Sequence, residues 1–164
     1  MSSIDHATTL ARLLLARGWT LALAESCTGG LVCATLTELS GSSEWFERGY
    51  ITYSNQAKTE CLGVSAELIK SHGAVSEPVA RAMAEGAQRN AGANVGVSIT
   101  GVAGPTGGTA EKPVGTVCFG WTIANAAGEN VTASQTKLFN GDRQAIRQQA
   151  TKYVLAGLIQ LLNN

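Results

Sequence analysis

The sequence predicts an α/β fold, a three-layer α/β/α sandwich built around a mixed sheet. Segments with helical spacing of apolar residues alternate along the chain with short strand-like segments, as in folds where helices connect neighbouring strands. Residues 125–128 form a turn signal between the last two strand-like runs, so these strands are expected to be antiparallel and the sheet to be mixed. A chain of 164 residues that is 45% apolar can bury one core, and we expect a single domain over residues 1–164.

The N-terminal part of the chain predicts a helix, a strand and a tight turn. Residues 4–17 carry apolar side chains on one helical face, and Gly18 is a suitable helix end. Residues 20–24 alternate as in a strand, with two leucines on one face. Helical spacing resumes at Leu31, so the residues in between connect a strand to a helix.

The middle of the chain predicts one strand followed by short helices. Aromatic and β-branched residues favour a strand over residues 44–53. Ser54 is a good N-cap for the short helix that follows, with Lys58 in its first turn. Helices are then expected over residues 66–72 and 77–91, and a short apolar strand over residues 95–100.

Residues 101–115 are too rich in glycine and proline for regular structure and predict a long loop. Loops of this length in compact domains are usually functional or disordered, and we expect a functional one because apolar strands flank it. Further strands are expected over residues 114–123 and 131–138, and a last helix over residues 141–162 whose apolar stripe packs into the core.

Charge and cysteine usage argue against several classes of protein. Twelve basic residues balance twelve acidic ones without runs of either sign, so we expect no nucleic-acid partner and no membrane partner. The chain has no apolar stretch of about 18 residues and no signal-peptide pattern at its start, which favours a cytoplasmic protein. The four cysteines are widely spaced, and only His6 and His72 accompany them, so neither a metal site nor a cofactor is expected.

The turn after the first predicted strand reads Ala-Glu-Ser-Cys-Thr-Gly-Gly over residues 24–30. Ser26 is a candidate nucleophile, because unpaired N–H groups at a helix start can hold a phosphate or a developing oxyanion and glycine allows close approach. A structural interpretation, in which Thr28 is only the N-cap of the helix, stays open. Cys27 is a rival nucleophile, since a helix N-terminus can lower the pKa of a thiol.

A lysine is the best available base for such a nucleophile. A desolvated amine loses its charge near neutral pH and can then accept a serine proton. Lys58 follows the aromatic strand, whereas Lys70, Lys112 and Lys152 lie in polar surroundings. An ordinary solvated lysine is the alternative interpretation of Lys58.

Other catalytic motifs are absent or lie in the wrong context. Neither G-x-x-x-x-G-K-[ST] nor G-x-G-x-x-G occurs, so nucleotide hydrolysis at a P-loop and dinucleotide redox chemistry have no support. Around Ser98 the chain approaches G-x-S-x-G, but inside a strand instead of at a sharp turn. A Ser-His-Asp triad would depend on His72 alone, which we expect at the surface or at a helix end.

Seven segments together resemble the CinA C-terminal-domain family, in the family's order and over almost the whole chain. They are residues 24–30 (AESCTGG), 45–50 (WFERGY), 52–58 (TYSNQAK), 73–76 (GAVS), 99–105 (ITGVAGP), 112–115 (KPVG) and 141–143 (GDR). The resemblance implies hydrolysis of the carboxamide of nicotinamide mononucleotide to nicotinate mononucleotide and ammonia, a step of pyridine-nucleotide salvage, by a serine nucleophile and a lysine base.

The resemblance also implies roles for individual residues. Ser26 would be the nucleophile, Lys58 the base, and Tyr53 a proton relay or an orienting group, with an aromatic strand residue in the core as the alternative for Tyr53. The substrate-binding residues implied around the oxyanion are Thr28, Gly29 and Gly30. Those implied around the ribose phosphate or pyridine ring are Gly101, Gly104, Thr106 and Gly107. Arg143 is implied at a phosphate, and the alternative is that Arg143 pairs with Asp142 or another acid.

The sequence also leads to expectations about accessory domains, assembly and regulation. Many relatives carry an additional N-terminal domain that resembles a molybdopterin-binding fold and is linked to ADP-ribose pyrophosphatase activity; this sequence lacks it, so we expect no such activity. The family resemblance favours a homo-oligomer, a dimer or larger. The alternative function is a nucleotide-binding regulatory module that keeps the pocket but does not turn over a substrate.

Overall fold

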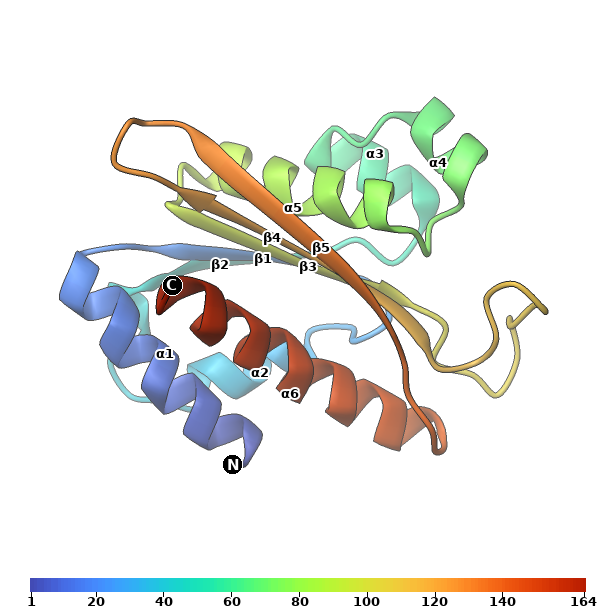
Figure 1. The fold of residues 1–164 in the computed structure, drawn as a ribbon, viewed down its shortest axis with the longest axis horizontal. Coiled ribbons are helices and arrows are strands. Elements are labelled where there is room, and N and C mark those ends of the chain that lie inside the picture. Colours follow the sequence, from blue (N-terminus) through green and yellow to red (C-terminus); the bar gives the residue numbers. More distant parts are fainter.

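A five-stranded mixed sheet lies between two layers of helices in the computed structural model, which describes residues 1–164 (Figure 1). The strand order is β2-β1-β3-β4-β5, with β1 parallel to β2 and β3 and with antiparallel pairs β3–β4 and β4–β5. Helices α1, α2 and α6 cover one face and α3, α4 and α5 the other, which confirms the predicted α/β/α sandwich. The strands are β1 (Leu21–Glu25), β2 (Phe46–Ile51), β3 (Val95–Gly101), β4 (Thr116–Ala124) and β5 (Asn130–Leu138).

The helices begin and end at residues that suit these positions. Serine side chains at the N-caps of α3, α4 and α5 accept hydrogen bonds from the first turn of each helix. Glycines with a left-handed backbone end α1, α3 and α5. The bounds are α1 (Ser3–Arg17), α2 (Leu31–Thr37), α3 (Asn55–Leu62), α4 (Ala66–His72), α5 (Glu77–Ala91) and α6 (Arg143–Leu162).

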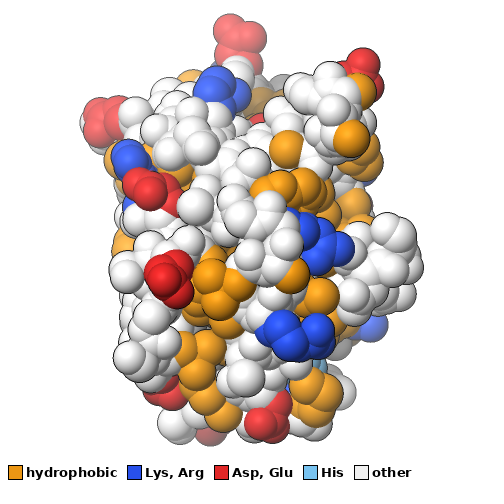
Figure 2. Space-filling view, turned by 90° about the vertical axis from the view of Figure 1, so that its left-hand side faces the viewer, with side chains coloured by type: hydrophobic (Ala, Val, Ile, Leu, Met, Phe, Trp, Pro, Cys, Tyr) orange, Lys and Arg blue, Asp and Glu red, His pale blue; other side chains and the backbone are white.

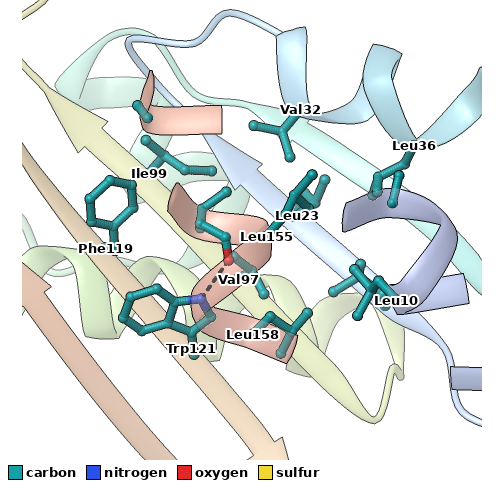
Figure 3. Close-up of a cluster of buried hydrophobic side chains, with 14 of the residues drawn as sticks. Leu10, Leu23, Val32, Leu36, Val97, Ile99, Phe119, Trp121, Leu155 and Leu158 are labelled. Carbon is teal, nitrogen blue, oxygen red and sulfur yellow. Dashed lines mark hydrogen bonds between the residues drawn. The ribbon is translucent and has the colours of Figure 1, made fainter. Parts of the chain in front are cut away.

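Two hydrophobic cores lie on the two sides of the sheet. The larger one contains 23 buried residues between the sheet and the layer of α1, α2 and α6, and in it the indole N–H of Trp121 donates to a carbonyl of α6 at 3.1 Å (Figure 3). Strand β1 divides its side chains as the alternation predicts: Leu21 and Leu23 belong to this core, whereas Ala22 and Ala24 belong to the smaller core beneath α5.

Glycines let α5 approach the sheet closely. A Cβ atom on Gly96 of β3 would collide with the carbonyl of Ala84, and one on Gly120 of β4 would collide with the carbonyl of Ala80. Both strand positions therefore require glycine. The close contact fixes α5, and with it the segment before α5, against the strands that carry the site described below.

Three elements begin two residues later than the sequence predicts. The strand expected over residues 44–53 is shorter, because a 3-10 turn precedes it and Trp45 is buried in the larger core. The strand expected from residue 114 begins after Gly115, whose φ of 98° is left-handed. Helix α6 begins two residues later than expected, since Gly141 has a φ of 117° and Asp142 is the N-cap.

The surface does not concentrate charge of one sign at the end of the molecule opposite the residue 101–115 loop. Figure 2 shows this end, where basic and acidic side chains are interspersed among apolar ones, in agreement with a formal net charge of zero. None of the helices combines the length and the apolar character needed to span a bilayer.

Candidate active site

The candidate site lies where the three parallel strands β1, β2 and β3 end, at one edge of the sheet. Ser26 follows β1 directly, and its N–H donates to the carbonyl of Ile99 in β3 at 3.0 Å. Thr52 follows β2, and its N–H donates to the carbonyl of Glu25 at 2.8 Å. These bonds extend the sheet by one residue and hold Ser26 beside Thr52.

Lys58 brings its amine to Ser26 from α3. Its side chain is 1% exposed, so the interpretation as a solvated surface lysine is wrong. Nζ lies 3.1 Å from Oγ of Ser26, 2.8 Å from the carbonyl oxygen of Thr52 and 3.5 Å from that of Tyr53. The structure therefore brings together the two side chains that the sequence marks as nucleophile and base.

No carboxylate pairs with Lys58 to stabilise its charged form. The one salt bridge in the structure joins Arg48 to Glu47, and burial lowers the pKa of the Lys58 amine from its ordinary value of 10.5. In the neutral amine, N–H groups donate to the two main-chain carbonyls and the lone pair remains for the hydroxyl of Ser26. Chemically, this arrangement suits removal of the serine proton.

Cys27 lines a pocket beside Ser26 and Lys58, but its surroundings disfavour the thiolate form. Burial raises the pKa of the Cys27 thiol to about 12. The expectation that the helix N-terminus lowers this pKa is therefore wrong. The N-terminal amides of α2 also do not stabilise a thiolate, because they bind the carboxylate of Glu25. Near neutral pH the side chain is a thiol, and the thiol is a much weaker nucleophile than the thiolate.

Glu25 organises the beginning of α2. Its fully buried carboxylate accepts hydrogen bonds from the N–H groups of Gly30 and Val32, both at 3.1 Å, and of Cys33 at 2.9 Å. Gly30 is the N-cap residue, so the interpretation of Thr28 as the N-cap is wrong. A charge-assisted cap of this kind satisfies amides that a helix start otherwise leaves unpaired.

Most of the amides expected at an oxyanion site are engaged elsewhere. The N–H of Gly29 donates to the carbonyl of Ser26 at 3.0 Å, and that of Gly30 donates to the carboxylate described above. The N–H groups of Cys27 and Thr28 donate to no protein acceptor. Thr28 is fully buried whereas Cys27 is 5% exposed and lines the pocket, so the amide of Cys27 is the one that a ligand can reach.

A pocket of about 260 Å³ opens beside Ser26 and Lys58. Thr28, Gly29 and Gly30 do not line it. Residues that do line it and that the sequence marks are Tyr53, Gly101, Gly104, Thr106, Gly107 and Arg143. Four more lining residues belong to segments that carry the family resemblance but were given no individual role: Asn55, Ala74, Val75 and Thr100.

Arg143 joins the start of α6 to the glycine-rich loop and to Tyr53. Its guanidinium donates to the carbonyl of Gly104 at 2.7 Å and to the hydroxyl of Tyr53 at 2.8 Å. The alternative of an ion pair with Asp142 is wrong, because Asp142 caps α6 through the N–H of Ala145. Tyr53 is 58% exposed and lies outside the core, so the core alternative is also wrong.

Arg147 is a residue that the sequence analysis missed. It lies one turn after Arg143 on α6, and its guanidinium donates from Nε to the carbonyl of Cys27 at 3.1 Å and from Nη2 to that of Thr28 at 2.9 Å. The i, i+4 spacing from Arg143 is the signal that could have drawn attention to it, since residues so spaced share a helix face. The role of Glu25 was also missed, although a charged residue at the end of a buried apolar strand indicates a polar network.

Metal-binding side chains do not gather anywhere in the structure: no group of three His, Cys, Asp or Glu residues is suited to hold an ion. His72 ends α4, and its carbonyl accepts a hydrogen bond from Lys112. Neither His72 nor His6 lines the pocket.

The sequence matches the family profile of the CinA C-terminal domain over residues 4–162. It is 54% identical over 147 residues to the nicotinamide-nucleotide amidohydrolase PncC of Escherichia coli strain K12, an alignment that covers 90% of this chain and 87% of that protein. It is 53% identical to a CinA-like protein of Syntrophobacter fumaroxidans, of which it spans 34%. The chain thus spans about a third of several curated relatives and most of others.

Solved structures show the same fold. The competence damage-inducible protein A (ComA) of Klebsiella pneumoniae superposes with a TM-score of 0.93 at 36% identity, covering 100% of this chain and 99% of that one. The competence/damage inducible protein CihA of Agrobacterium tumefaciens gives a TM-score of 0.90 at 38% identity, with 100% and 98% covered.

Proposed function

Because this chain belongs to the CinA C-terminal domain family, we propose that it is a nicotinamide-nucleotide amidohydrolase that converts nicotinamide mononucleotide to nicotinate mononucleotide and ammonia. The observation that carries the proposal is the buried pair of Ser26 and Lys58, with 3.1 Å between Oγ and Nζ and no carboxylate on the lysine. The 54% identity to PncC supports the choice of substrate.

The proposed reaction passes through an acyl-enzyme. The neutral amine of Lys58 accepts the hydroxyl proton while Oγ of Ser26 attacks the carboxamide carbon. The resulting ammonium group donates a proton to the departing nitrogen, so that ammonia leaves and an ester to Ser26 remains. Water hydrolyses the ester: Lys58 accepts a proton from the attacking water and returns it to Oγ of Ser26, and the carboxylate product leaves.

The pocket offers hydrogen-bond donors for an anionic nucleotide. Arg143 uses two of its N–H groups on Gly104 and Tyr53, and the arginine side chain has five N–H donors in all, so others remain for a phosphate. Backbone groups of the loop that contains Gly101, Gly104, Thr106 and Gly107 surround the remaining space.

Ammonia release from nicotinamide mononucleotide in the presence of a chelator tests the proposal. We expect turnover by the wild type and by Cys27→Ala, and loss of turnover in Ser26→Ala and Lys58→Met. Activity that depends on Cys27 and survives Ser26→Ala would identify the thiol as the nucleophile. A folded wild type that binds the nucleotide in calorimetry but releases no ammonia would favour the regulatory module.

Four further properties belong to the same proposal. We infer one catalytic domain over residues 1–164, a role in pyridine-nucleotide salvage, a cytoplasmic location and a homo-oligomer. Limited proteolysis, growth of a deletion strain on nicotinamide mononucleotide, cell fractionation and light scattering test these in turn.

A further inference from the structure

Arg147 binds the turn that carries the nucleophile without entering the pocket. Its guanidinium donates to the carbonyls of Cys27 and Thr28, and no carboxylate pairs with it. The side chain is half-buried and does not line the cavity beside Ser26. An arginine whose charge is satisfied only by two consecutive main-chain carbonyls fixes the two peptide planes to which these carbonyls belong.

The direction of these carbonyls determines the direction of the neighbouring amides. In a trans peptide the C=O and the following N–H point in opposite directions. The bond to the carbonyl of Cys27 therefore turns the N–H of Thr28 away from Arg147. The bond to the carbonyl of Thr28 does the same for the N–H of Gly29, which donates to the carbonyl of Ser26.

The free amides of the turn are those next to Ser26. Glu25 and the carbonyl of Ser26 consume the amides of Gly30 and Gly29, whereas those of Cys27 and Thr28 have no protein acceptor. Cys27 itself lines the pocket. The carbonyl of Ser26 belongs to the same peptide as the N–H of Cys27 and accepts from the N–H of Gly29, whose own peptide is held by Arg147, so Arg147 fixes the direction of the Cys27 N–H through the turn.

We propose that Arg147 is a positioning residue that fixes the turn after Ser26, so that the free N–H of Cys27, a residue that lines the pocket, receives the oxygen of the tetrahedral intermediate. This inference rests on the proposed amide hydrolysis. Arg147 touches neither substrate nor reacting atoms in this role; it acts through the backbone of the turn. Its contribution belongs to the transition state, because the oxygen carries full charge only there.

Steady-state kinetics of Arg147→Ala, with Arg17→Ala as the matched control, test this role. Arg17 also donates to two main-chain carbonyls, those of Leu13 and Leu162, but it lies away from the pocket. We expect Arg147→Ala to lower kcat by about 10- to 100-fold, while KM changes less than about threefold. Millimolar guanidinium should restore part of kcat in Arg147→Ala but not change that of Arg17→Ala or the wild type. Unchanged kcat, or an equal loss in Arg17→Ala, would overturn the inference.

An amide NMR spectrum separates this inference from the proposed reaction. If the wild type does not release ammonia, the proposed function fails, yet the effect of Arg147 on the turn is still measurable. The resonances of Thr28 and Gly29 should move in Arg147→Ala more than in Arg17→Ala, because the hydrogen bonds at the preceding carbonyls are lost. Resonances that stay in place would refute the positioning role whatever the kinetics show.

Discussion

The buried amine of Lys58 links the pH dependence of catalysis to the pH dependence of stability. Burial holds the pKa of the native amine below 10.5, whereas the unfolded chain exposes it to water. Between these two pKa values the unfolded chain binds more protons at this side chain than the native protein does. The free energy of unfolding must therefore rise with pH across that interval.

The comparison with Lys58→Met isolates the effect of this one group. The difference in unfolding free energy between wild type and Lys58→Met should be flat below the native pKa of Lys58, rise by up to about 1.4 kcal/mol per pH unit above it, and level off again near 10.5. Contributions from the other titrating groups largely cancel in this difference. Since the neutral amine is the base, kcat/KM of the wild type should rise about tenfold per pH unit below the same pKa and level above it.

Urea unfolding and initial rates measured over the same pH series give two independent values of one pKa. The total change in the stability difference should equal about 1.4 kcal/mol for each pH unit by which the kinetic midpoint lies below 10.5. Lys70→Met, at an exposed position of α4, is the control: it shows how the loss of one lysine charge alone changes stability and rate. A stability difference that does not vary with pH, or a kinetic midpoint that disagrees with it, would refute the assignment of Lys58 as a neutral base.

Two further predictions concern residues around the pair. Glu25→Gln replaces the acceptor of three backbone N–H groups by an amide that presents its own N–H to them. We therefore expect the free energy of unfolding in urea to fall by about 2–3 kcal/mol. The exposed Glu111→Gln should change it by less than about 0.5 kcal/mol. Tyr53→Phe removes a hydroxyl that contacts Arg143 while it keeps the carbonyl near Lys58, so kcat/KM should fall less than about tenfold. A fall of about 100-fold or more would instead mark the hydroxyl as a proton relay.

The architecture follows from patterns of short range, and the sequence analysis captured it for that reason. The alternation of Leu21 and Leu23, the serine caps and the five-residue turn between β4 and β5 are each set by neighbouring residues. The errors lie at element ends, where single residues decide. Gly115 and Gly141 adopt left-handed backbones that end or delay an element, and nothing in the spacing of apolar residues reveals this.

The candidate site was found only in part. The strand-to-helix turn marks Ser26 as a candidate and the surroundings of the lysines favour Lys58, and the family resemblance implies the same two residues. The contacts of Arg147 with residues 27 and 28 join parts of the chain about 120 residues apart, and only the fold reveals them. The pKa of Cys27 was predicted in the wrong direction, because the thiol is buried and because a second side chain occupies the helix N-terminus.

That second side chain, Glu25, explains how Lys58 remains without a carboxylate although one lies next to Ser26 in the sequence. Side chains of a strand alternate between the faces of its sheet, so Glu25 points with Leu21 and Leu23 toward the layer of α2. Lys58 comes from α3, in the opposite layer. The sheet thus separates acid from base, and the three amides that bind Glu25 keep its carboxylate on its own side. Ser26, the next residue in the chain, lies at the edge of the sheet, where the amine can reach its hydroxyl.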